Sequence, residues 1–147
     1  MTEVSFHFNV AERIGYACRL LRKATRQSAR VVVTGDESTL AELDQALWAF
    51  DPIEFIPHLL LRPGAAIPDR VRATPVWLAE RAADAMAATN SHEVLVNLGT
   101  DAPEGFESFQ RLIEIVSNDE SDRGAARLRW KHYANRGYSI VRHEVGE

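Results

Sequence analysis

Residues 30–36 read Arg-Val-Val-Val-Thr-Gly-Asp, and this short stretch decides the fold class. Its β-branched run over residues 30–34 is typical of a strand that is buried on both faces, since branched side chains pack well on a pleated surface. The glycine and aspartate that follow close the strand, and a helix over residues 38–50 is expected next. A strand of this kind followed directly by a helix is typical of α/β proteins.

The segments on either side continue the alternation of strands and helices. Apolar and polar residues alternate from Val4 to Phe8, which predicts a half-buried strand, and a basic amphipathic helix follows over residues 11–27. A last helix over residues 119–136 is expected to end at Gly137, because glycine readily adopts the left-handed backbone found there. Further strands are predicted over residues 58–61, 75–79 (an edge strand), 93–98, 111–116 and 138–142. The succession predicts an α/β sandwich with a largely parallel sheet.

Length and composition indicate one globular domain over residues 1–147. Hydrophobic residues make up 46% and charged residues 26% of the chain, which excludes a disordered or repetitive protein. Four of the six prolines fall in residues 51–74, so a long loop is expected there. The single cysteine, the lack of a signal-peptide pattern and the lack of a long apolar run predict a cytoplasmic protein outside the membrane.

The sequence offers no motif for a nucleotide cofactor. Gly35 and Gly99 each follow a predicted strand, but both are isolated, and Asp36 and Glu37 beside Gly35 would repel a phosphate. The pattern therefore predicts no functional nucleotide-binding loop and no cofactor. A nucleotide-dependent enzyme is a hypothesis that rests on the fold class alone.

The sequence also offers no motif for catalysis or for metal binding. The five histidines show no pair at ligand spacing, and Cys18 falls on the apolar side of its helix, where a small buried hydrophobe is expected. The acidic pair Asp119 and Glu120 lies in the first turn of the last helix, where the helix dipole favours carboxylates without any catalytic role. No metal site and no catalytic residue are predicted.

The most informative stretch runs from Arg123 to His143, where six basic residues occur without a single acid. The whole chain carries a charge of −4, so this window of +6 leaves −10 on the other residues. At about 100° per residue, one stripe of the helix collects Arg123, Arg127, Trp130 and Lys131. The stripe is either a solvated polar face, a site for an acidic peptide with an aromatic residue or terminal carboxylate, or a site for single-stranded nucleic acid.

Two further aromatic residues have an open role. Leu40, Leu43 and Leu47 form the core stripe of their helix, which leaves Trp48 off its centre, and Phe55 lies between prolines on a loop. Both either cap the core beneath the loop or belong to an interaction surface.

Several motifs in their order along the chain resemble the chi subunit family of bacterial DNA polymerase III holoenzyme. The most specific block runs from Leu43-Asp44 through Leu47-Trp48 to Phe55-x-Pro57-His58. It is accompanied by Ala17-Cys18-Arg19-Leu20, Arg30-Val31-Val32-Val33, Leu95-Val96-Asn97-Leu98, Ile113-Glu114-Ile115-Val116 and Trp130-Lys131-x-Tyr133. The resemblance covers nearly the whole chain.

The resemblance implies a single three-layer Rossmann-like domain that acts as a non-enzymatic adaptor of the clamp loader. It implies two partners, the psi subunit and the acidic C-terminal tail of single-stranded-DNA-binding protein, with DNA contacted only indirectly. The family's tail pocket corresponds here to Val116, Arg123, Arg127, Trp130 and Lys131. Positions that look like its psi-binding surface are Trp48 and Phe55. In this reading Val116 and Trp130 hold the tail's terminal Phe, Arg127 and Lys131 its carboxylate, and Arg123 the upstream aspartates.

Overall fold

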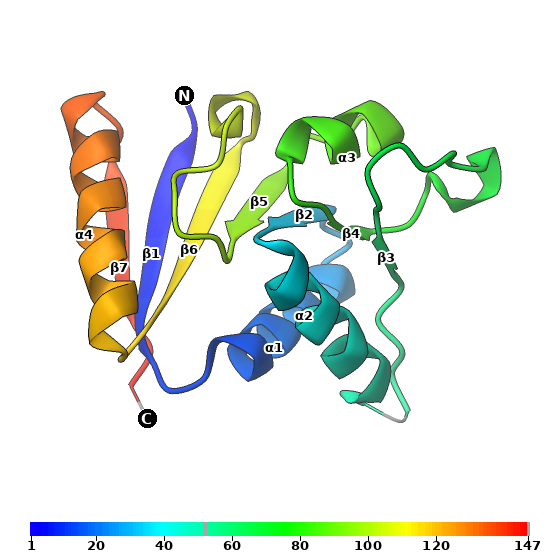
Figure 1. Cartoon of the computed structure of the whole chain (residues 1–147), viewed down its shortest axis with the longest axis horizontal. Helices are drawn as coiled ribbons and strands as arrows, with labels where there is room; N and C mark the ends of the chain where they lie inside the picture. Colours follow the sequence, from blue (N-terminus) through cyan, green and yellow to red (C-terminus); the bar gives the residue numbers. More distant parts are fainter. Residues whose placement is uncertain (52, 147) are drawn as a thin grey trace.

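Seven parallel strands form one twisted sheet in the order β3-β4-β2-β5-β6-β1-β7 (Figure 1). The structure is a computed structural model that describes residues 1–51 and 53–146. The strands are β1 (Glu3–Val10), β2 (Val31–Thr34), β3 (His58–Leu60), β4 (Val76–Leu78), β5 (Val94–Asn97), β6 (Arg111–Ser117) and β7 (Ile140–Glu144). The predicted parallel sheet is confirmed, with β3 and β7 at its two edges.

Helices cover both faces of the sheet. One face packs against α1 (Arg13–Arg26) and α2 (Glu37–Ala49), and the other against α3 (Ala82–Thr89) and α4 (Glu120–Asn135). Successive strand residues point to opposite faces, so Val31 and Val33 of β2 enter the α1–α2 core whereas Val32 enters the α3–α4 core. The fold is therefore a three-layer Rossmann-like α/β architecture, as predicted.

Local capping explains where the helices begin and end. Asp36 lies just before α2 and its carboxylate accepts a hydrogen bond from the backbone N–H of Thr39 at 2.8 Å. Asp119 plays the same role before α4, whose first backbone donors would otherwise be unpaired. After α4, Gly137 adopts a left-handed backbone with φ of 84°, which confirms its predicted role as the helix stop.

Between residues 75 and 89 the sequence-based prediction was wrong about one strand and missed one helix. The strand predicted at residues 75–79 is not at an edge, because β4 pairs with both β3 and β2. Pro75 is compatible with this central place since it precedes the first paired residue, where its missing N–H costs nothing and its carbonyl still accepts from Val31. Helix α3 was not predicted, since its run of alanines shows little apolar periodicity.

The remaining expectations concern loops and burial. Within the described part of residues 51–74, β3 and the short 3-10 turn η1 (Asp69–Val71) are the only regular elements, whereas Pro52 lies outside the described residues. Cys18 is buried as predicted, and burial raises the pKa of its thiol to about 11. None of the helices described is long and apolar enough to cross a membrane.

Candidate binding groove

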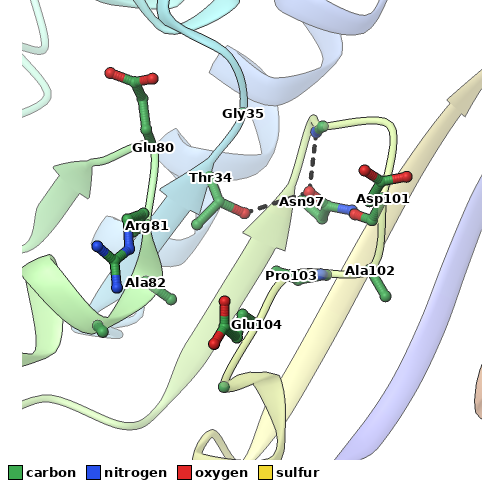
Figure 2. Close-up of a pocket in the computed structure, with 13 residues that line it drawn as sticks. Thr34, Gly35, Glu80, Arg81, Ala82, Asn97, Asp101, Ala102, Pro103 and Glu104 are labelled. Atoms are coloured by element: carbon green, nitrogen blue, oxygen red, sulfur yellow. Dashed lines mark hydrogen bonds between the residues drawn. The ribbon is translucent and has the colours of Figure 1, made fainter.

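A first crevice lies where β2, β4 and β5 end, the place at which doubly wound sheets usually bind ligands. It has a volume of about 430 Å³ and is shown in Figure 2. Carboxylates of Glu80, Asp101 and Glu104 line it with the single guanidinium of Arg81. This excess of negative charge disfavours a phosphate.

The backbone of this crevice is also unsuited to a phosphate. The N–H of Gly99 donates to the side-chain oxygen of Asn97 at 2.9 Å, and Thr34 donates to the same oxygen at 3.3 Å. A Cβ on Gly99 would lie 3.2 Å from that oxygen, so this glycine permits a tight turn. In the part of the chain that the structure describes, no three His, Cys, Asp or Glu side chains gather to hold a metal ion.

A second and larger hollow, the α4 groove, lies between α4 and strands β1 and β7. Its volume is about 550 Å³, and it contains all five residues that the family resemblance assigns to a tail pocket. Strand β6 supplies Val116, whereas α4 supplies the other four. The complete lining is Phe6, Phe8, Asn9, Val116, Ser117, Asn118, Arg123, Ala126, Arg127, Trp130, Lys131, Arg142 and Glu144.

Trp130 forms the aromatic centre of the α4 groove. Its ring lies 5.0 Å from the ring of Phe6, centroid to centroid, and the Arg142 guanidinium carbon lies 5.9 Å from it. The same guanidinium lies 5.2 Å from the Phe8 ring, so the arginine is close to two aromatic faces. Trp130 is thus half-buried against the sheet. It lies at the border of the polar face of α4, the face to which the helical spacing assigned it.

Positive charge in the α4 groove comes from four exposed side chains. Arg123 and Arg127 both approach the carboxylate of Glu120, at 3.9 and 3.3 Å. Lys131 and Arg142 have no carboxylate within 4 Å among the described residues. The groove therefore combines an apolar floor with two paired and two unpaired cations.

Arg129, which the sequence counts with the basic window, does not belong to this surface. It is buried under α4, and its Nε lies 2.9 Å from the carboxylate of Glu114. The same carboxylate accepts hydrogen bonds from Tyr133 at 2.5 Å and from Asn97 at 3.0 Å. Burial raises the pKa of Glu114, an effect that the guanidinium of Arg129 opposes. Arg129 is therefore not available to a ligand, and the charge count of residues 123–143 did not show this because Glu114, its partner, lies outside that window.

Residues from β1 and β7 were missing from the site predicted by sequence. The alternation of the first strand does place Phe6 and Phe8 on one face, and Arg142 lies within the acid-free window. The pairing of β1 with β6 brings Phe6 and Phe8 to α4, and the pairing of β7 with β1 sets Arg142 opposite Phe6. Sequence patterns hold no signal for that pairing between the two ends of the chain.

The other two predicted residues form a separate aromatic patch of Trp48, Phe55 and His58. Trp48 is 59% exposed and Phe55 52% exposed, so neither caps the core. Their rings lie 5.1 Å apart, and the Trp48 ring lies 5.0 Å from His58, whose Nε2 is 3.2 Å from the Asp44 carboxylate. The patch lies on α2 and the segment leading to β3, at the sheet edge opposite the α4 groove (Figure 1).

The fold and its surfaces define a class of protein: a parallel α/β domain whose distinctive chemistry is a cationic, aromatic surface groove. Over residues 1–141 the chain matches the family described as DNA polymerase III chi subunit, HolC. The chain belongs to this family, which confirms the resemblance read from its motifs.

Curated relatives agree with this assignment. DNA polymerase III subunit chi of Pseudomonas aeruginosa is 33% identical over 150 residues, covering 99% of this chain and 98% of the relative. The Haemophilus influenzae protein of the same name is 28% identical, with 88% and 85% of the two chains covered. Among solved structures, the C-terminal domain of S. cerevisiae Dbp5 matches with a TM-score of 0.58 at 10% identity, covering 100% of this chain and 92% of that one. That match concerns the fold alone.

Proposed function

We propose that this chain is a non-catalytic adaptor of the DNA polymerase III clamp loader. One surface, the α4 groove, binds the acidic C-terminal tail of single-stranded-DNA-binding protein, and the aromatic patch binds the psi subunit. The adaptor acts in the cytoplasm, where it connects the clamp loader to protein-coated DNA and contacts DNA only indirectly. Its family membership supports a role in replication as a polymerase accessory subunit.

The chemistry of the α4 groove is the observation that carries the proposal. Val116, Ala126 and Phe6 supply an apolar floor beside Trp130, and four cations surround it. An aromatic side chain can pack on such a floor while carboxylates pair with guanidinium and ammonium groups at the rim. An acidic peptide that ends in an aromatic residue matches both features.

A peptide end fits the α4 groove better than single-stranded nucleic acid does. A nucleic-acid strand requires a basic track that continues past the site, with aromatic faces open for stacking. Here four cations surround one groove in a chain of charge −4, and Trp130 packs against Phe6 on the sheet. Direct binding of single-stranded DNA remains the alternative that the experiment below separates.

The aromatic patch suits a different kind of partner. Its exposed apolar rings are flanked by charges that are already paired, including Arg26 with Glu54 and Arg22 with Asp51 at 3.6 Å. A surface of this type gains free energy from burial of aromatic area, as interface hot spots do. We therefore assign the psi subunit to it.

Titration of a labelled acidic tail peptide tests the groove. Binding with a Kd of about 1 µM, equivalent to about −8 kcal/mol, is expected for so small a contact. Arg127→Ala and Trp130→Ala should each weaken binding by about tenfold or more. Arg136→Ala is the matched control, since Arg136 is an exposed residue of the same segment that does not line the groove.

Unchanged affinity in both Arg127→Ala and Trp130→Ala would contradict the site. A second titration uses a fluorescent single-stranded oligonucleotide without any other protein. Tight binding of the oligonucleotide, lost in the same variants, would favour the nucleic-acid alternative instead.

A further inference from the structure

Arg142 differs from the other cations of the α4 groove in where it comes from. It projects from β7, across the groove from α4, whereas Arg123, Arg127 and Lys131 all belong to the helix. In the sheet, Arg142 is in register with Phe6, and the ring of Phe6 lies 5.0 Å from the ring of Trp130. Arg142 therefore forms part of the wall that faces the helical cations.

The surroundings of Arg142 hold its guanidinium in place without neutralising it. The group lies near the faces of Phe8 and Trp130, at 5.2 and 5.9 Å from their centroids. Contact with aromatic faces occupies the plane of a guanidinium and leaves its N–H edge available for a carboxylate. Among the described residues no carboxylate lies within 4 Å of it, although Glu144 lines the same groove.

The cations of α4 divide into two groups according to whether a carboxylate lies within 4 Å of them. Arg123 and Arg127 share Glu120, so an incoming carboxylate has to compete with it. Lys131, directly after Trp130 in the chain, has no such competitor among the described residues. The two unpaired cations of the groove are therefore Lys131 and Arg142, and the guanidinium of Arg142 lies beside the aromatic centre, 5.9 Å from the Trp130 ring centroid.

We infer that Arg142 is a further peptide-binding residue and that, with Lys131, it binds the terminal carboxylate of the acidic peptide. The inference rests on the proposed function of the α4 groove and adds a residue that faces the helix. In a terminal aromatic residue the ring and the carboxylate belong to the same amino acid. A ring packed beside Trp130 thus brings its carboxylate close to Arg142, which reaches it from β7 and adds to the helical cations expected to bind it.

A double-mutant cycle between protein and peptide tests this pairing. The probes are one acidic peptide ending in Phe with a free carboxylate and the same peptide with a C-terminal amide. They are titrated against the wild-type chain, Arg142→Met, Arg142→Lys and the control Arg136→Met. Methionine keeps much of the apolar stem of arginine, and thermal melting checks that each variant is folded.

Amidation should weaken binding to the wild-type chain by about tenfold, the effect of losing a charge-assisted contact. Arg142→Met should weaken binding of the free peptide by about fivefold and reduce the amidation effect to about twofold, because the two changes remove the same contact. Arg142→Lys should restore part of the amidation effect, and Arg136→Met should behave as the wild type.

Two results would overturn the inference while leaving the proposed function intact. The first is unchanged binding of the free peptide to Arg142→Met. The second is weaker binding with the full amidation effect retained, since Arg142 would then contact another part of the peptide. Failure of the wild-type chain to bind either peptide would overturn the proposed function, and the assignment of Arg142 with it.

Discussion

The two edges of the sheet carry opposite kinds of surface. At the β3 edge, the aromatic patch exposes Trp48 and Phe55, and the neighbouring arginines Arg22 and Arg26 are paired with carboxylates. At the β7 edge, the ring of Trp130 is half-buried and the α4 groove carries four exposed cations, two of them without a partner among the described residues. One edge offers apolar area and the other offers charge.

This difference indicates how each surface is used. Burial of aromatic area does not depend strongly on salt and favours a partner that stays bound. Charge pairs at an exposed groove are screened by salt and bring partners together quickly, which favours a partner that exchanges. A domain with both surfaces can remain in one complex while it repeatedly binds and releases a second protein.

The largest expected effect comes from the buried pair beneath the α4 groove. Glu114→Ala leaves the Arg129 guanidinium buried without its counter-charge, which should lower the free energy of unfolding by about 3 kcal/mol and Tm by roughly 10 °C. Thermal melting measures the change. Glu54→Gln, which removes an exposed pair at the other edge, is the control and should leave Tm unaltered. Equal melting of the two variants would show that the groove lacks this buried support.

The second effect concerns the aromatic patch. The double variant Trp48→Ala and Phe55→Ala should weaken the proposed complex with the psi subunit by about 3 kcal/mol, more than a hundredfold, because two exposed rings are removed from the proposed interface. Co-purification and titration calorimetry measure the loss. Tail-peptide affinity should stay at the wild-type value. A parallel loss of tail binding would mean that the two edges do not act independently.

A salt titration should then separate the two surfaces without any mutation. Raising NaCl from about 50 to about 200 mM should weaken tail-peptide binding by about tenfold, since the Debye length shortens and the groove cations are exposed. Binding at the aromatic patch should change by less than about twofold, because apolar burial carries little charge. Similar salt dependence at both surfaces would refute the distinction drawn between them.

The smallest effect tests the paired cations of the groove. Glu120→Gln removes the carboxylate that Arg123 and Arg127 share, so both become available to a ligand. Tail-peptide affinity should rise by about twofold to threefold, as expected for an exposed ion pair. Glu107→Gln, an exposed acid outside the groove, is the control. A fall in affinity for Glu120→Gln would show that Glu120 supports ligand binding instead of opposing it.

Sequence patterns predicted those features of the fold that depend on local periodicity. The valine run of β2, the amphipathic α1 and the glycine stop of α4 were all found where expected. The failures came where a residue's place depends on how the strands pair in the folded sheet. Pro75 suggested an edge strand, but β3, which precedes that proline in the chain, pairs with β4 on the side away from β2 and makes the strand internal.

The candidate groove shows the same limit at the level of single residues. Helical spacing grouped Arg123, Arg127, Trp130 and Lys131, because these residues share one stretch of helix. That spacing left Arg129 out of the stripe, but the charge count of the window still included it, since its burial depends on Glu114 in β6, which Tyr133 also contacts. Helical spacing missed Arg142 because its place depends on the pairing of the last strand with the first.

That pairing of β7 with β1 also determines when the wall of the α4 groove that carries Arg142 is in place. The contact joins residues 4–8 to residues 140–144, so almost the whole described chain has to be ordered before the second wall is in position. Long-range contacts of this kind form late in folding, and an edge strand is among the first elements to open locally. Opening of β7 alone would remove Arg142 from the groove while the central strands stay hydrogen-bonded. Hydrogen exchange of the β7 amides therefore reports the fraction of molecules competent to bind, and that fraction scales the apparent affinity directly.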